Sequence, residues 1–476
     1  MPPFRAARTA ALLFAACSTL DAQRPKRSAP AAPSAPQTAA TPRLNIATDY
    51  WTLGNGLRVV FSRDTTAPTV GVGVYYKVGF RTEPRDRTGF AHLFEHLMFQ
   101  GSQNMGKMQF VKLIENNGGI LNGSTRFDFT NYYEVVPAHV LETILWAEAD
   151  RMRGLQIDQT NIDNQRDVVK NEVRVNVQNQ PYGGFPWIDL PMTANTNWAN
   201  AHDFYGDFKD LDAATLENAR TFFRTYYAPN NAVLAVVGDF NPADARAWVL
   251  KYFSDIKASE PPPPLDVGEP HQAVERTHSR VDSLANRPAL GLAWHVPPRW
   301  TPEWFAMGLI DQLLAQGRDS RLYDALVQRA NLTGEINAGI NWGLGNQFNY
   351  EGPMLWVVTA YHDTNKPASA LLTVIDKELD LLRAKPVDAA TLTRTKTKMR
   401  SQLYGIADES FGLGKLDLLA SFALFDGDPA RVNFLERGFD AVTPALIQKV
   451  AKDWLNKENR TVYTIVPGAK TSGGAP

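Results

Sequence analysis

Short apolar runs alternate with longer segments of helical periodicity along most of this chain. Runs rich in β-branched and aromatic residues predict strands, and apolar residues that recur every three or four positions predict helices. In the first half, the predicted strands are Arg58–Phe61, Val70–Tyr76, Asn131–Val136 and Ala232–Gly238, the last of which closes the first sheet. The predicted helices of this half are the segment Phe90–Phe99 and a long helix from about Val140.

The second half repeats this scheme. Strands are predicted at Ala289–Trp294 and Met354–Thr359, and helices near Phe305–Leu314, Ala368–Arg383 and Ala389–Tyr404. The fold class that follows is α+β, with two homologous α/β-sandwich domains that arose by duplication. Each domain is expected to hold an antiparallel-dominated sheet packed with helices.

Two proline-rich segments divide the chain. Residues 23–43 are rich in Pro, Ala and Ser and cannot bury enough surface to fold, so we interpret them as a tether. Four consecutive prolines at 261–264 favour an extended spacer. We therefore expect an N-terminal domain at 44–258, a linker at 259–268, a C-terminal domain at 269–468 and a disordered tail at 469–476.

Composition agrees with a folded protein that has no bulk affinity for polyanions. The 476 residues are 44% apolar and 11% aromatic, which is enough for two sizeable cores. The 49 basic and 50 acidic residues give a net charge of −1, so no overall field attracts nucleic acid or anionic membranes. Neither is expected as a partner.

The first 22 residues have the features of an export signal. Arg5 and Arg8 precede a short apolar stretch, and small residues around Ala22 suit cleavage there. No other segment approaches the roughly 18 apolar residues of a membrane-spanning helix. We expect a periplasmic protein of a bacterial envelope. Cys17 is the only cysteine, which excludes disulfides, and a lipid anchor on Cys17 after cleavage before it is the alternative.

His92, Glu95 and His96 carry the clearest chemical signal in the chain. Side chains four residues apart lie on one face of a helix, so both imidazoles can bind one zinc ion while Glu95 acts as a general base toward water. The helix is otherwise apolar, so the imidazoles need partners. A chance match on a solvated helix is the competing interpretation, and eight histidines in 476 residues make it rare.

Glu172 is the candidate for the third ligand, because a catalytic zinc site takes three protein ligands and leaves one position for water. It lies beside a predicted helical stripe made of Ile162, Val168, Val169 and Val173. By its position alone, an exposed helix carboxylate is the competing interpretation.

The chain resembles pitrilysin-type and mitochondrial-processing-peptidase-like zinc peptidases, the inverzincin group, which carry the inverted His-x-x-Glu-His motif. The resemblance extends through the segments Gly118–Thr125, Asp128–Tyr133, Val168–Glu172, Asn179–Gly183 and Ser320–Tyr323. It implies one zinc ion per chain, bound by His92, His96 and Glu172, and a peptide or unfolded polypeptide as substrate. Glu172 follows His96 by 76 residues, in agreement with the family spacing.

The resemblance also implies a substrate-binding edge strand at Gly119–Thr125, where an extended peptide adds to an exposed ladder. Asn122, Gly123 and Ser124 are the expected contacts. A simple glycine-rich bend is the alternative.

A second copy of the motif helix lies at an offset of 216 residues. Leu93–Gly101 aligns with Leu309–Gly317, so that Gly308, Asp311 and Gln312 replace His92, Glu95 and His96. With a slightly larger offset, Gln402 stands opposite Glu172. Unless the match is a coincidence of helical patterning, the C-terminal domain is a metal-free homologue of the catalytic N-terminal domain.

Two positions depart from the family pattern. Gln165 replaces a further glutamate seven residues before the ligand glutamate, and Val327 and Gly334 replace an Arg and a Tyr that stabilise the oxyanion. Arg321, Tyr323 and Arg329 are possible local substitutes.

The missing oxyanion donors predict a partner. We expect the chain to be the zinc-bearing half of a clam-shell dimer, completed by a homologous metal-free subunit. The competing classes are a non-catalytic structural or peptide-binding subunit of an envelope complex, and a peptide trap with a structural zinc.

Overall fold

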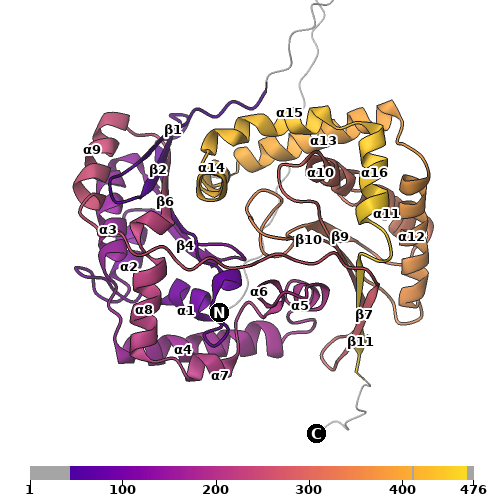
Figure 1. Cartoon of the computed structure of the whole chain (residues 1–476), viewed down its shortest axis with the longest axis horizontal. Helices are drawn as coiled ribbons and strands as arrows, with labels where there is room; N and C mark the ends of the chain where they lie inside the picture. Colours follow the sequence, from indigo (N-terminus) through magenta and orange to yellow (C-terminus); the bar gives the residue numbers. More distant parts are fainter. Residues whose placement is uncertain (1–42, 410–411, 469–476) are drawn as a thin grey trace, which may run out of the picture. The chain divides into compact units, whose positions relative to one another are not determined.

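The computed structural model describes residues 43–409 and 412–468 (Figure 1). The expected export signal, Cys17, the tether up to residue 42 and the tail at 469–476 lie outside the described residues. Of the helices described, none combines the length and the apolar content that crossing a membrane requires.

The first half of the chain forms a six-stranded sheet in the order β1-β2-β6-β3-β5-β4. Its strands are β1 (Asp49–Thr52), β2 (Arg58–Arg63), β3 (Thr69–Tyr76), β4 (Ile120–Thr125), β5 (Thr130–Pro137) and β6 (Ala232–Gly238). Neighbouring strands are antiparallel except β2 and β6, which are parallel. The prediction that Ala232–Gly238 closes the sheet is wrong, because β6 lies inside it between β2 and β3. Its apolar run is buried by neighbours on both sides.

The second half forms a five-stranded sheet in the order β7-β11-β8-β10-β9. Its strands are β7 (Arg276–Asp282), β8 (Ala289–His295), β9 (Asn337–Ile340), β10 (Leu355–Tyr361) and β11 (Arg460–Pro467). The pair β11 and β7 is parallel, and the other neighbours are antiparallel. This order and these directions repeat those of β2-β6-β3-β5-β4, so the predicted duplication and the antiparallel-dominated sheets are confirmed.

Helices pack on both sheets. Those of the first half are α1 (Phe90–Leu97), α2 (Gln109–Asn116), α3 (Leu141–Arg153), α4 (Gln159–Val173), α5 (Asp189–Ala194), α6 (Trp198–Ala201), α7 (Phe208–Asp212), α8 (Leu216–Tyr226) and α9 (Pro242–Phe253). Those of the second half are α10 (Pro302–Leu314), α11 (Arg321–Tyr323), α12 (Ala368–Ala384), α13 (Ala389–Ala407), α14 (Leu413–Asp426), α15 (Leu435–Ala441) and α16 (Pro444–Trp454). The predicted helices correspond to α1, α3, α10, α12 and α13.

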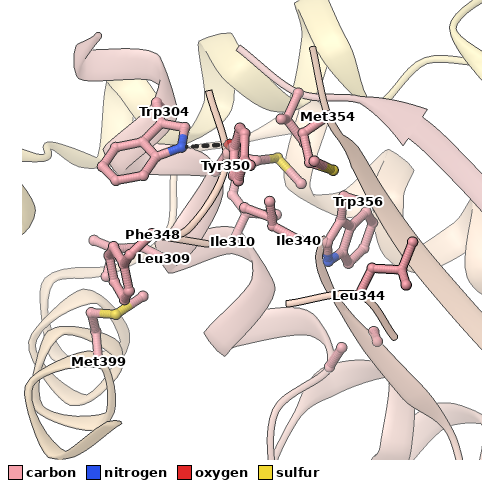
Figure 2. Close-up of a cluster of buried hydrophobic side chains, with 14 of the residues drawn as sticks. Trp304, Leu309, Ile310, Ile340, Leu344, Phe348, Tyr350, Met354, Trp356 and Met399 are labelled. Carbon is pink, nitrogen blue, oxygen red and sulfur yellow. Dashed lines mark hydrogen bonds between the residues drawn. The ribbon is translucent and has the colours of Figure 1, made fainter. Parts of the chain in front are cut away.

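The core of the second half lies between its sheet and helices α10 and α13. Figure 2 shows Trp304 and Ile310 of α10 and Met399 of α13 in the same apolar cluster as Trp356 of β10. The indole of Trp304 donates a 2.8 Å hydrogen bond to the hydroxyl of Tyr350, so its polar atom is paired within the core.

Helices of the same half of the chain cover one face of each sheet, and a helix from the opposite half covers the other face. Helix α14 of the second half packs on β3, β6 and β2, and helix α5 of the first half packs on β8, β11 and β7 (Figure 1). Both helices rest on a glycine. A Cβ on Gly73 of β3 would lie 2.7 Å from Leu416 of α14, and one on Gly291 of β8 would lie 2.7 Å from Phe185, which precedes α5. The two halves are therefore interlocked.

Candidate metal centre and substrate edge

Helix α1 begins at a position that requires glycine. Gly89 has a φ of 81°, and a Cβ there would lie 2.4 Å from the carbonyl oxygen of Tyr205. The carboxylate of Glu83 accepts hydrogen bonds from the N–H groups of Gly89 (2.8 Å) and Ala91 (2.6 Å). These are amides that a helix start leaves without partners. His202 lies 3.6 Å from the same carboxylate. Glu83 therefore fixes the start of the motif helix.

His92, His96 and Glu172 come together between α1 and α4. The two Nε2 atoms of the imidazoles are 3.3 Å apart. The Oε2 atom of Glu172 lies 3.2 Å from Nε2 of His96 and 3.7 Å from Nε2 of His92. The structure thus brings together three potential ligand atoms from residues that are up to 80 positions apart in the sequence.

Helix α4 packs against α1, and its buried stripe sets the side of the helix on which Glu172 lies. Ile162, Val169 and Val173 are buried as the pattern predicts. Val168 is 41% exposed, so its place in the stripe is wrong. It lies directly beside Val169, and adjacent residues on a helix point about 100° apart. The helix then continues into a π-helical turn at Arg174–Gln178, a distortion that is frequent near functional sites.

Tyr205 holds the second oxygen of Glu172. Its hydroxyl donates a 3.1 Å hydrogen bond to Oε1, which leaves Oε2 turned toward the imidazoles. Burial raises the pKa of Glu172, but the hydrogen bond with His96 and the nearby histidines outweigh it, so the pKa is lowered. Glu172 is therefore ionised at neutral pH, the state in which a carboxylate binds a cation.

The geometry suits a zinc ion. Tetrahedral zinc with bonds of about 2.0–2.1 Å keeps its ligand atoms roughly 3.3 Å apart, which is close to the separations between the Nε2 and Oε2 atoms here. Burial, followed by the charge of His96, lowers the pKa of His92 to about 3, so its ring is neutral and free to bind a metal at neutral pH.

Glu95 lies beside this cluster and does not join it. Its side chain is partly buried, and its Oε2 accepts a 2.7 Å hydrogen bond from the hydroxyl of Thr125 on β4. Burial raises the pKa of Glu95, and the hydrogen bond from Thr125 and the charges of His96 and Arg126 oppose that rise. A carboxyl group whose proton affinity is raised in this way is suited to accept a proton near neutral pH.

The expected substrate strand is an edge strand. β4 is the last strand in the order of the first sheet, paired only with β5 among the described strands. Asn122, Gly123 and Ser124 do not share one face of it. A Cβ on Gly123 would lie 3.2 Å from Cγ of Glu95, whereas Ser124 donates a hydrogen bond to Asn131 on the opposite face. The side chain of Asn122 accepts a hydrogen bond from the N–H of Gly123.

Comparison with known proteins identifies the family. Residues 58–184 match the family described as "Insulinase (Peptidase family M16)", and residues 213–399 match "Peptidase M16 inactive domain". The chain belongs to peptidase family M16. The first match lies within the first half, and the second begins in the first half and ends in the second, so the "inactive" description falls mainly on the half without the His-x-x-Glu-His motif.

Relatives of this M16 chain include named zinc proteases. It is 26% identical over 420 residues to zinc protease PqqE of Helicobacter pylori, covering 87% of this chain and 92% of that protein. It is 28% identical over 225 residues to a probable mitochondrial-processing peptidase subunit beta of Arabidopsis thaliana, covering 47% and 40%. A crystal structure of a protease from Helicobacter pylori matches with a TM-score of 0.81 at 25% identity, covering 89% of this chain and all of that one. These matches support a peptidase-like role.

The second M16 half has the helices of the site without its ligands. Asp311 on α10 accepts hydrogen bonds from the indole of Trp356 (2.7 Å) and the amide of Gln316. At Gly308, a Cβ would lie 2.5 Å from the amide of Gln347, so that side chain occupies the space where an imidazole would lie. The positions of this half that correspond to the motif therefore contribute to the packing of its core.

The departures from the M16 pattern have structural counterparts. Gln165 is buried and donates a hydrogen bond to Asn164, so it adds no charge near the cluster. Val327 and Gly334 offer no side-chain donors. Arg329 is paired with Asp324 (2.7 Å) and Glu378 (2.9 Å), which engages its guanidinium away from the histidines.

Sequence reasoning did not single out Glu83, Thr125 or Tyr205. Thr125 lies in a segment that carries the family resemblance, but Glu95, with which it forms a hydrogen bond, is on another element. The sequence therefore did not indicate their contact. Glu83 and Tyr205 carry no sequence signal, because their partners are 6 to 33 residues away across turns.

Proposed function

We propose that this chain is a zinc-dependent endopeptidase that hydrolyses peptides or unfolded polypeptides. The observation that carries the proposal is the convergence of His92 Nε2, His96 Nε2 and Glu172 Oε2 beside the partly buried carboxyl group of Glu95. The names of the relatives agree with this chemistry.

Each residue has a distinct part in the proposed reaction. His92, His96 and Glu172 would hold the zinc ion, and Tyr205 orients Glu172. When bound, zinc polarises a peptide carbonyl and lowers the pKa of water. Glu95 accepts the proton of the attacking water and passes it to the leaving amine, and the hydroxyl of Thr125 keeps the carboxylate of Glu95 in place. The free edge of β4 aligns the substrate backbone.

We further propose that a homologous, metal-free subunit completes the site. Val327 and Gly334 stand where self-sufficient family members resemble one another in an Arg and a Tyr, so this chain lacks those donors. The Arabidopsis relative is named as a subunit of a peptidase. For its location, we propose the bacterial periplasm, on the export features of the first 22 residues.

The test combines metal content with proteolysis. The purified chain is assayed with an unstructured reporter peptide, with and without a chelator and a homologous second subunit. Glu95→Gln is expected to retain one zinc per chain and lose about 10²- to 10⁴-fold in turnover. His92→Ala, His96→Ala and Glu172→Gln are expected to lose the metal as well. Glu115→Gln, an exposed carboxylate on α2, is the matched control.

The outcomes separate the alternatives. Undiminished activity of Glu95→Gln contradicts the role of Glu95. Zinc binding without proteolysis under any of these conditions favours a non-catalytic, peptide-binding subunit. Full activity of the isolated chain contradicts the need for a partner.

A further inference from the structure

A cavity of about 410 Å³ opens on the side of β4 that faces away from the metal centre. Its walls come from both halves of the chain. The first half contributes polar and aromatic side chains of the β3–β5 region, and the second half contributes the loop before β10 and the start of α14. Its lining includes Ser124, Arg126, Tyr133, Asn346 and Asp417.

The pleat of β4 separates this cavity from the metal side. Positions 123 and 125 face Glu95, as the contacts of Gly123 and Thr125 with that residue show. Successive side chains of a strand point to opposite faces, so Ser124 faces the cavity, where it meets Asn131 of β5. A peptide added to the free edge of β4 follows the same alternation. Every second side chain of the peptide would point toward the cavity.

Arg126 gives the cavity its chemical character. It is the one cation among the described residues of the lining, and within the described parts of the chain its guanidinium has no ion pair or hydrogen-bond partner. The two acidic residues of the lining do not neutralise it by contact. Both oxygens of Asp417 accept hydrogen bonds, from Tyr75 (3.1 Å) and Asn349 (3.2 Å). Glu409 is exposed, so water screens its charge.

The position of Arg126 also ties the cavity to the reaction centre. Thr125, the residue before Arg126 in the chain, donates a 2.7 Å hydrogen bond from its hydroxyl to Glu95. A group bound by Arg126 is therefore held by the residue next to the one that contacts Glu95.

We propose that this cavity is a substrate subsite that accepts an acidic side chain, with Arg126 as its specificity-determining residue. The proposal rests on the proposed peptidase function, because it takes the free edge of β4 as the place where the substrate lies. An Asp or Glu side chain would supply the carboxylate that the guanidinium lacks, and the side-chain amide of Asn346 would donate a further hydrogen bond. The preference is expected only at alternate substrate positions, because intervening side chains face Glu95.

The test uses an alanine-based peptide series in which Glu, Gln or Lys is placed in turn at each position around one cleavable bond. Cleavage is measured as the ratio of kcat/KM for the Glu and Gln peptides. Binding is measured by fluorescence anisotropy on the Glu95→Gln protein, which does not turn the peptides over. We expect Glu to be favoured over Gln by about 10- to 100-fold, at alternate positions only. In Arg126→Gln the ratio is expected to fall to about 1.

Arg318→Gln is the matched control, since it removes one positive charge at an exposed position outside the cavity and should keep the wild-type ratio. Equal binding of the Glu, Gln and Lys peptides, a preference for Lys, or a Glu preference spread evenly over all positions would overturn the proposal. So would a Glu preference that survives in Arg126→Gln. If no peptide is cleaved with or without the homologous second subunit, the proposed function fails, while the anisotropy series still decides whether the subsite exists.

Discussion

The side-chain amide of Gln312 donates a 2.6 Å hydrogen bond to that of Gln402, and this contact between α10 and α13 occupies the place of the contact between His96 and Glu172. In both halves, one residue of the first helix reaches a residue of the crossing helix. The duplication has kept the contact and replaced its chemistry, because two neutral amides can pair with each other without a cation.

This replacement predicts one zinc site per chain. Gln312→Ala should leave the zinc content of the purified protein at one equivalent, while unfolding becomes easier by about 1 kcal/mol because a hydrogen bond is lost. Metal analysis and urea denaturation of the same sample check both effects. A loss of zinc in this variant would contradict the assignment of the site to the first half.

Tyr205 is expected to control metal affinity through Glu172. Tyr205→Phe removes the 3.1 Å hydrogen bond to Oε1 and frees the carboxylate to rotate. Loss of such a partner to a metal ligand typically weakens binding by about 10- to 100-fold. Competition with a zinc-specific chelator measures the change. Tyr252→Phe, which removes a hydroxyl from a hydrogen bond to Glu142, a residue outside the cluster of potential metal ligands, is the control and should leave the affinity unchanged.

The interlocking of the two halves can be tested at Gly73 and Leu416. Gly73→Ala should destabilise the protein by about 1–3 kcal/mol, because the new Cβ would lie 2.7 Å from Cδ2 of Leu416. In a Leu416→Ala background that atom is absent, and the same substitution should cost much less. Urea denaturation of the four proteins gives the coupling. Additive costs would show that α14 does not rest on Gly73 in solution.

The buried ion pair of Arg81 and Asp128 connects the halves and should be essential for stability. The guanidinium of Arg81 donates hydrogen bonds to Asp128 (2.7 Å) and to the carbonyl oxygen of Pro353 (2.6 Å). Asp128 also accepts a hydrogen bond from the N–H of Glu351. Because both side chains are buried, Asp128→Asn is expected to cost about 3–5 kcal/mol.

The control for this pair is an exposed one. Breaking the pair of Arg224 and Glu217 with Arg224→Gln should leave the free energy of unfolding close to that of the wild type in the same urea denaturation experiment, because water screens both charges. Similar costs for the buried and the exposed pair would contradict the role of Arg81 and Asp128.

His202 and Glu83 should make stability depend on pH. Burial lowers the pKa of His202, but the Glu83 carboxylate at 3.6 Å and the carbonyl of Trp198 outweigh it, so the pKa is raised above 6.5. Since the folded protein binds this proton more tightly than the unfolded chain, the stabilisation is complete below pH 6.5 and is lost as the pH rises through the folded pKa.

The free energy of unfolding of the wild type should therefore fall as the pH rises above 6.5, measured by urea denaturation from pH 6 to 9. Glu83→Gln should abolish that fall, because the partner that holds the proton is gone. His139→Asn, at an exposed histidine, should keep the wild-type slope. An unchanged slope in Glu83→Gln would exclude the pair as its cause.

Periodicity identified the elements that carry their own burial pattern. Strands β2, β3, β5, β6, β8 and β10 and helices α1, α3, α10, α12 and α13 stand out because an apolar stripe or run is readable over their own residues. Strand β7 was not predicted, since its sequence Arg-Thr-His-Ser-Arg-Val-Asp is mostly exposed at the edge of a sheet. The reciprocal packing of α5 and α14 was not predicted either, because a buried stripe does not say which sheet will bury it.

The sequence by itself determined that His92, Glu95 and His96 share one helix, because the backbone repeat of a helix places them there whatever surrounds it. Only the tertiary structure decided that Glu172 turns its Oε2 toward them, that Thr125 holds Glu95, and that Arg126 faces a cavity lined by both halves. Those relationships depend on how distant segments pack, and packing is a property of the whole folded chain.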